Sequence, residues 1–170
     1  VLFATIIVTF LIIVSEVALT AMLYALLRPA GRTLALTATF ARLGMTVLQA
    51  VNLLPHLAAL QLVSGAEHLS AFDADELHAL ALLSLDVHDA GVHVWEIFFG
   101  LHCLLVGVLV FRSGFFPRAF GALMGLASFG YALNGLGNLV APDSASVFAA
   151  LVGIAALVGE VPVVLWLLIK

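Results

Sequence analysis

The sequence predicts an all-α fold, a polytopic transmembrane helical bundle. Of its 170 residues, 64% are hydrophobic and 9% are charged, and the mean hydropathy is +1.24. Residues 1–15 and 101–111 contain no Asp, Glu, Lys or Arg. A soluble globule of this length needs more polar surface than such a chain offers. We therefore expect a single transmembrane helical domain over residues 1–170.

Five segments are long and apolar enough to span a bilayer, which takes about 20 mainly apolar residues. Turn residues and charges mark their ends, beginning with Arg28 and Pro29 after the first segment. The predicted spans are residues 1–27, 33–63, 91–111, 118–140 and 146–169. No pair of broken helices is evident, which argues against a dedicated secondary transporter.

A polar stretch separates the second and third spans. Gly65 ends the second span, and Asp73 with Glu76 three positions later has the pattern of a capping box. We expect a short interfacial helix near residues 74–87. A helix that continued through the third span would be nearly twice a membrane thickness, so we predict a break or kink around residues 88–91.

The charged residues predict an orientation in the membrane. Basic residues gather at one set of helix ends: Arg28, Arg32, Arg112, Arg118 and Lys170. Acidic residues occupy the other loops: Glu67, Asp73, Asp75, Glu76 and Asp143. The positive-inside rule places the basic loops and the carboxyl terminus in the cytoplasm. The net charge of −4 argues against nucleic acid as a partner and leaves the lipid bilayer as the expected one.

Several motifs in order along the chain resemble one known family. They are Leu23-Tyr24 with Arg28-Pro29, Phe40-Ala41-Arg42-Leu43, His88-Asp89, Phe99-Gly100-Leu101-His102 and Phe111-Arg112-Ser113-Gly114. This series is similar to the uncharacterised bacterial membrane family called domain of unknown function 4386. The resemblance implies a six-helix inner-membrane protein, whose first helix would precede Val1. It implies no activity, cofactor or catalytic residue.

Ionisable residues form a stripe on the third span. At 100° per residue, Asp89, His93 and Glu96 fall on one arc. Such groups are costly inside a bilayer, so the stripe should face protein or water. His88 and His102 fall well away from this arc, and we expect them outside any site built on it.

Two other spans carry matching polar faces. Gln49, Asn52 and His56 share a face with Arg42 on the second span, while Asn134 and Asn138 lie on one edge of the fourth span with Tyr131. Depth along the helices sorts these groups into layers. An outer layer holds His56, Asn52, Asp89, His93, Glu96, Asn134 and Asn138. A middle layer holds Glu16, Gln49, His102 and Glu160, with both carboxylates expected in the bundle interior.

Metal binding is one hypothesis for the outer layer. His56, Asp89, His93 and Glu96 supply two imidazoles and two carboxylates, a ligand set that suits zinc or iron. A metal-bound water could then hydrolyse a membrane substrate. The spacing matches no strict metalloenzyme signature.

The interpretation we favour is a structural or small-molecule-binding bundle whose polar groups bond to one another. The polar network would include Glu16, Gln49, Asn52, Asn134, Asn138 and Glu160. Small-residue packing, as at Gly121 and Gly125, would bring the helices close together. This bundle would carry its His/carboxylate pocket toward the outer face.

Cofactor binding and assembly are further alternatives. His56, His93 and His102 are candidate axial ligands for haem, and an apolar bundle could equally hold a quinone. The chain could also form a homo-oligomer or serve as an accessory subunit of a larger membrane complex, roles that leave no residue-level trace.

Overall fold

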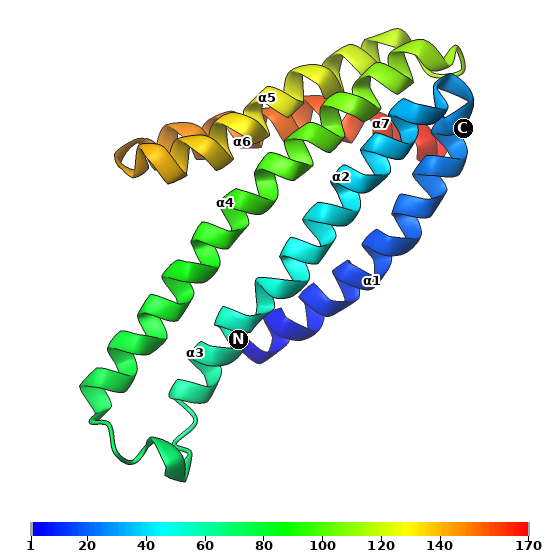
Figure 1. Cartoon of the computed structure of the whole chain (residues 1–170). Coiled ribbons are helices and arrows are strands. Elements are labelled where there is room, and N and C mark those ends of the chain that lie inside the picture. Colours follow the sequence, from blue (N-terminus) through cyan, green and yellow to red (C-terminus); the bar gives the residue numbers. More distant parts are fainter. Residues whose placement is uncertain (1, 170) are drawn as a thin grey trace.

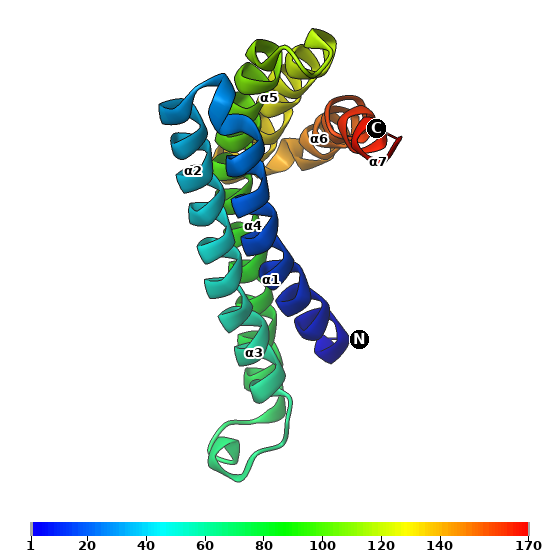
Figure 2. The same cartoon turned by 90° about the vertical axis from the view of Figure 1, so that its right-hand side faces the viewer.

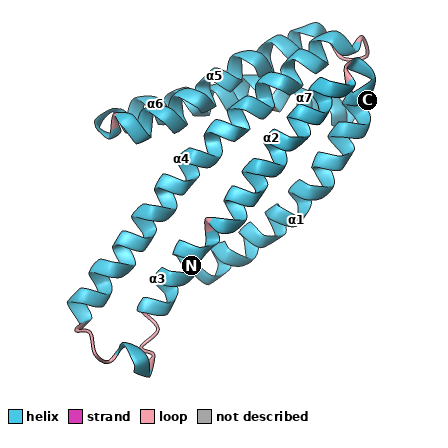
Figure 3. Cartoon of the chain, viewed as in Figure 1, coloured by secondary structure: helices cyan, strands magenta, loops and turns pink. Residues whose placement is uncertain are grey.

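The computed structural model describes residues 2–169, which form helices joined by short loops (Figure 3). The helices are α1 (Leu2–Leu27), α2 (Arg32–Val51), α3 (Leu53–Leu62), α4 (Ala74–Ser113), α5 (Arg118–Val140), α6 (Ala145–Gly159) and α7 (Val161–Ile169). Three short 3-10 helices lie in the turns: Arg28–Ala30, Glu67–Leu69 and Pro142–Ser144. Within residues 2–169 there is no strand, and the all-α prediction is confirmed.

Five stretches of this helical chain are long and apolar enough to cross a membrane. They are Ile6–Ala30, Arg32–Leu62, Ala74–Ser113, Arg118–Val140 and Pro142–Ile169. The number and order of the predicted spans are therefore confirmed, and the chain is a multi-pass membrane protein by the length and composition of its helices.

The helices form two groups. Helices α1, α2 and α4 lie along one another, while α5 packs back against α4 and α6 packs against α5 (Figure 1). Figure 2 shows α7 returning to the level of the turn between α1 and α2. The amino-terminal part of α4 extends beyond α5 and is accompanied by α3. This arrangement leaves α1 and α7 at the edges of the bundle, next to lipid in a membrane.

Helix α4 begins where the capping box predicts. The Glu76 amide donates to Asp73 Oδ1 at 2.8 Å, and the Asp73 amide donates to Glu76 Oε2 at 3.1 Å. The helix then runs for 40 residues, about 60 Å, without interruption to Ser113. The expected break around residues 88–91 is absent, and the expected short helix near 74–87 is the first part of α4.

The glycine at position 91 allows close packing against α4 rather than a break in the helix. A Cβ atom added at Gly91 would collide with the carboxamide of Asn52. The lower helix propensity of glycine, about 1 kcal/mol relative to alanine, is too small to break a long helix that packs on its neighbours. Gly91 therefore admits the Asn52 side chain against the backbone of α4.

The contact between α4 and α5 depends on small residues. A Cβ atom at Gly107 would come within 2.8 Å of both the Gly121 carbonyl oxygen and the Gly125 amide nitrogen. One at Gly121 would come within 2.5 Å of the Gly107 carbonyl oxygen. The expected packing at Gly121 and Gly125 is thus present, with Gly107 as the partner across the interface.

The second and fifth spans each contain one irregular residue. The regular helix assignment is interrupted at Asn52, between α2 and α3, and at Glu160, between α6 and α7, while the backbone stays in the right-handed helical region at both residues. Pro55 and Pro162 follow these positions, and each lacks the amide that would bond the carbonyl four residues earlier. Each span nevertheless runs on as one stretch, Arg32–Leu62 or Pro142–Ile169, and the two prolines account for the local irregularity.

Candidate functional site

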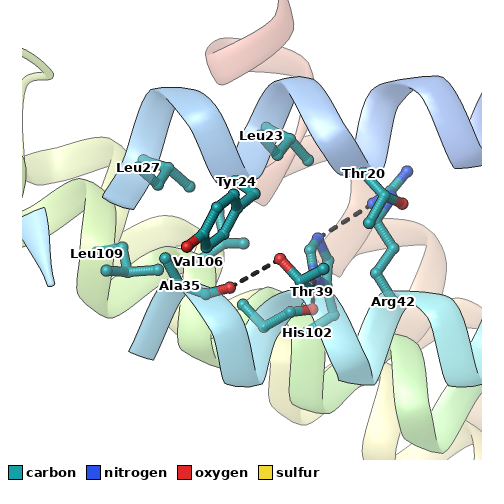
Figure 4. Close-up of a pocket in the computed structure, with 11 residues that line it drawn as sticks. Thr20, Leu23, Tyr24, Leu27, Ala35, Thr39, Arg42, His102, Val106 and Leu109 are labelled. Carbon is teal, nitrogen blue, oxygen red and sulfur yellow. Dashed lines mark hydrogen bonds between the residues drawn. The ribbon is translucent and has the colours of Figure 1, made fainter. Parts of the chain in front are cut away.

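A buried polar cluster joins α1, α2 and α4 near mid-depth in the bundle. Arg42 extends from α2 toward Thr20 of α1 (Figure 4). Its guanidinium forms an ion pair with Glu16. Its Nη1 donates to His102 Nε2 at 3.1 Å. The Arg42 side chain is only 7% exposed and that of Glu16 is 19% exposed. Two opposite charges are therefore held together away from water, where each would be costly alone.

The hydrogen bonds of His102 fix its tautomer. An arginine can only donate, so Nε2 of His102 accepts from Arg42. Nδ1 then carries the proton and donates to the Ala38 carbonyl oxygen at 2.9 Å. Both ring nitrogens are used in this arrangement, and neither has a lone pair left for haem iron. His102 acts as a link between α2 and α4, a role that the sequence analysis did not assign.

A second polar cluster joins α4 and α5. The Asn134 side-chain amide donates to the two Glu96 carboxylate oxygens at 2.8 and 2.7 Å. His93 Nδ1 lies 3.1 Å from Glu96 Oε2. The Asn138 amide donates to the Asn134 side-chain oxygen at 3.1 Å. Glu96 is therefore supplied with donors from both helices, the arrangement expected of a satisfied polar network.

A third polar cluster joins α2 and α3 to α4 at Asn52. The Asn52 amide donates to the His88 carbonyl oxygen at 2.9 Å, and His88 Nδ1 donates to the Asn52 carbonyl oxygen at 2.8 Å. The imidazole rings of His56 and His88 lie 3.8 Å apart between centroids. A hollow beside them is lined by Thr9, Gln49, Asn52, His88, Val92 and Trp95. His88, which we expected outside the site, is thus the partner of His56.

The four proposed metal ligands are not gathered into one set. His56 pairs with His88, whereas His93 and Glu96 pair with each other, and Asp89 is exposed. Among residues 2–169, no three His, Cys, Asp or Glu side chains lie close enough to hold a metal ion. The reason is rotational: His88 and His93 are five residues apart, so they face different neighbours across α4.

The middle layer is also divided. Glu16 pairs with Arg42, while Glu160 accepts a hydrogen bond from the Tyr131 hydroxyl of α5. Gln49, which we placed near both carboxylates, instead lines the hollow beside His88, and its Oε1 is buried without a partner in the described part of the chain. Each carboxylate therefore has a separate environment.

A largely apolar cleft lies between α1, α4 and α7, with a volume of about 690 Å³ that includes its open mouth. Aliphatic and aromatic side chains form its walls: Leu19, Leu23, Leu26, Leu27, Phe99, Val106, Val110, Phe116, Met124, Val163, Val164 and Leu167. Arg42, His102, Cys103 and Glu160 contribute the polar atoms. This cleft lies toward the basic-loop ends of the helices, whereas the pocket expected from the sequence lies toward the acidic loops.

Some of these partnerships had a signal in the sequence. Arg42 lies ten residues from Arg32, and His102 lies eleven residues from Ser113. At 1.5 Å per residue both are about 15 Å from the basic ends of their helices, so a match in depth was available. The pairing of Tyr131 with Glu160 had no comparable signal, because it depends on how α6 lies against α5.

Comparison with known proteins adds a family but no activity. The family model described as Domain of unknown function (DUF4386) matches residues 1–170. An uncharacterized protein from Archaeoglobus fulgidus is 40% identical over 74 residues, 44% of this chain and 42% of that protein. The aligned region thus spans less than half of the relative, and no solved structure matches the chain. Because the family model matches the whole length, the chain belongs to the DUF4386 family.

Proposed function

We propose that this protein binds an amphiphilic small molecule in the cleft between α1, α4 and α7. The observation that carries the proposal is the combination of apolar walls with a few polar atoms at the base, contributed by Arg42, His102 and Glu160. Such a site suits a ligand with an apolar body and one polar group.

The position of the cleft supports entry from the lipid phase. Leu19, Val164 and Leu167, which belong to the two helices at its edges, are 42%, 53% and 45% exposed. In a bilayer these side chains face acyl chains, so an amphiphile dissolved in the membrane reaches the cleft without crossing water.

A cleft-filling substitution tests this function. Val163→Trp should reduce binding of a neutral, environment-sensitive apolar dye to the purified protein by roughly tenfold or more, because the indole occupies the cavity. Leu136→Trp is the matched control, since Leu136 is 52% exposed on α5 and lies outside the cleft lining. Equal dye binding by the two variants, with melting temperatures near that of the wild type, would contradict the proposal.

The proposed orientation places the cleft in the cytoplasmic half of a bacterial inner membrane. The distribution of basic residues supports it, through the positive-inside rule. In a background where Cys103 is replaced by Ala, a cysteine at Asp73 or Asp143 should react with an impermeant thiol reagent in intact cells, while one at Ser113 should not. Reaction at Ser113 alone would reverse the orientation and move the cleft to the outer half.

A further inference from the structure

We propose that the cleft prefers lipophilic organic cations and that Glu160 is the residue that recognises their charge. This inference rests on the proposed function and names the class of ligand.

The charge balance of the cleft leaves one carboxylate without a counter-ion. Arg42 is already paired with Glu16, and its Nη1 is used by His102. Glu160 accepts one hydrogen bond, from the Tyr131 hydroxyl to Oε1. Within residues 2–169, no basic side chain forms an ion pair with Glu160. A cation that enters the cleft would therefore supply the charge partner that Glu160 lacks within residues 2–169.

Glu160 is placed where a ligand can reach it. It occupies the interruption between α6 and α7, about 14 Å from the end of α7 at 1.5 Å per residue. It lines the cleft between α1, α4 and α7 and also a second hollow that includes Tyr131, Ala156 and Val161. Glu160 thus borders two hollows, whereas Glu16 faces the Arg42 guanidinium.

The aromatic rings of the cleft also suit a cation. Phe99 and Phe116 line the cleft, and the Phe99 ring lies 4.7 Å from the Tyr131 ring in an edge-to-face arrangement. The faces of aromatic rings attract organic cations, more strongly when water is absent. An anionic ligand would instead place a second negative charge beside Glu160, while the positive charge of Arg42 is already compensated by Glu16.

A pair of ions with the same shape and opposite charge tests the inference. Tetraphenylphosphonium and tetraphenylborate should be compared for their ability to displace the neutral dye from the wild-type protein in non-ionic micelles, after correction for binding to protein-free micelles. We expect the cation to displace the dye at about tenfold lower concentration than the anion. This magnitude corresponds to one charge-assisted contact.

Substitution of the carboxylate provides the second measurement. Glu160→Gln should weaken displacement by the cation by about tenfold while leaving binding of the neutral dye unchanged. Glu160→Asp, which keeps the charge, should retain the preference. Glu96→Gln is the matched control, because Glu96 is a buried carboxylate that lies outside the cleft lining and is held by Asn134.

The outcomes separate this inference from the proposed function. If the dye binds and Val163→Trp reduces its binding, but the anion displaces it as well as the cation does, the cleft binds amphiphiles and the preference for cations is overturned. Unchanged displacement by the cation in a folded Glu160→Gln variant overturns it as well. If the dye does not bind at all, the proposed function fails, and the further inference fails with it. If Glu160→Gln does not fold, the comparison of the two ions on the wild-type protein decides whether the cleft prefers cations.

Discussion

Removing either member of the Arg42–Glu16 ion pair should destabilise the protein more than removing both. Arg42→Met leaves the Glu16 carboxylate without its partner and also removes the donor to His102. Glu16→Leu leaves a guanidinium that is 7% exposed with only a neutral imidazole beside it. Breaking a buried ion pair by removing one partner typically costs about 3–5 kcal/mol. We expect each single variant to lose free energy of unfolding in that range.

The double variant should recover most of this loss. With both charges gone, the remaining defect is the unpaired Nε2 of His102, which costs about 1–3 kcal/mol. The sum of the two single effects, about 6–10 kcal/mol, should therefore exceed the effect of the double variant by several kcal/mol. The excess measures the coupling between Arg42 and Glu16.

Equilibrium unfolding in mixed micelles, with increasing SDS and circular dichroism as the signal, gives the four free energies that the cycle needs. The wild type and the Glu16→Leu, Arg42→Met and double variants should be measured at one protein concentration. Additive effects of the two single substitutions would refute the reasoning, because they would mean that the charges do not depend on each other. Single variants as stable as the wild type would mean that the ion pair is solvated in the membrane protein.

Two further substitutions test the helix contacts. Gly91→Ala should lower the free energy of unfolding by about 1–3 kcal/mol in the same assay, because the added methyl group collides with Asn52. Helix propensity alone predicts the opposite, a gain of about 1 kcal/mol. Gly153→Ala is the control and should show this gain, because the space around its Cβ position is open. Asn134→Leu should cost about 1–3 kcal/mol, because Glu96 keeps only His93 as a donor; a melting temperature equal to that of the wild type would contradict the assigned hydrogen bonds.

The sequence predicted the elements of this fold well, because a bilayer constrains them strongly. Each span had to supply about 20 apolar residues, and this requirement alone located five of them. The capping box located the start of α4 to the residue, since its two hydrogen bonds are local. A span depends only on its own run of apolar residues, and a capping box depends only on residues within one turn of the chain.

The partners of the polar residues were harder to predict. Helical periodicity gives the direction of a side chain from its own axis, but not the rotation of the neighbouring helix. His93 and Glu96 were correctly grouped because they lie on the same helix. His56 was assigned to His93, whereas the rotation of α2 and α3 brings it to His88. Gly91 was interpreted as a weak point because its partner, Asn52, lies 39 positions away.

The irregular residues of the second and fifth spans, Asn52 and Glu160, share one feature. In each, a proline removes one backbone amide from the helix ladder, and the chain departs from regular helix at a polar residue, Asn52 or Glu160. The side chain at that position bonds to a different helix, Asn52 to α4 and Glu160 to α5. The missing backbone bond in each span thus lies where an interhelical hydrogen bond supports the chain. Since the bond at Glu160 comes from the single hydroxyl of Tyr131, whereas Asn52 shares two hydrogen bonds with His88, the position at Glu160 is the less supported of the two, and it is the one that lines the cleft.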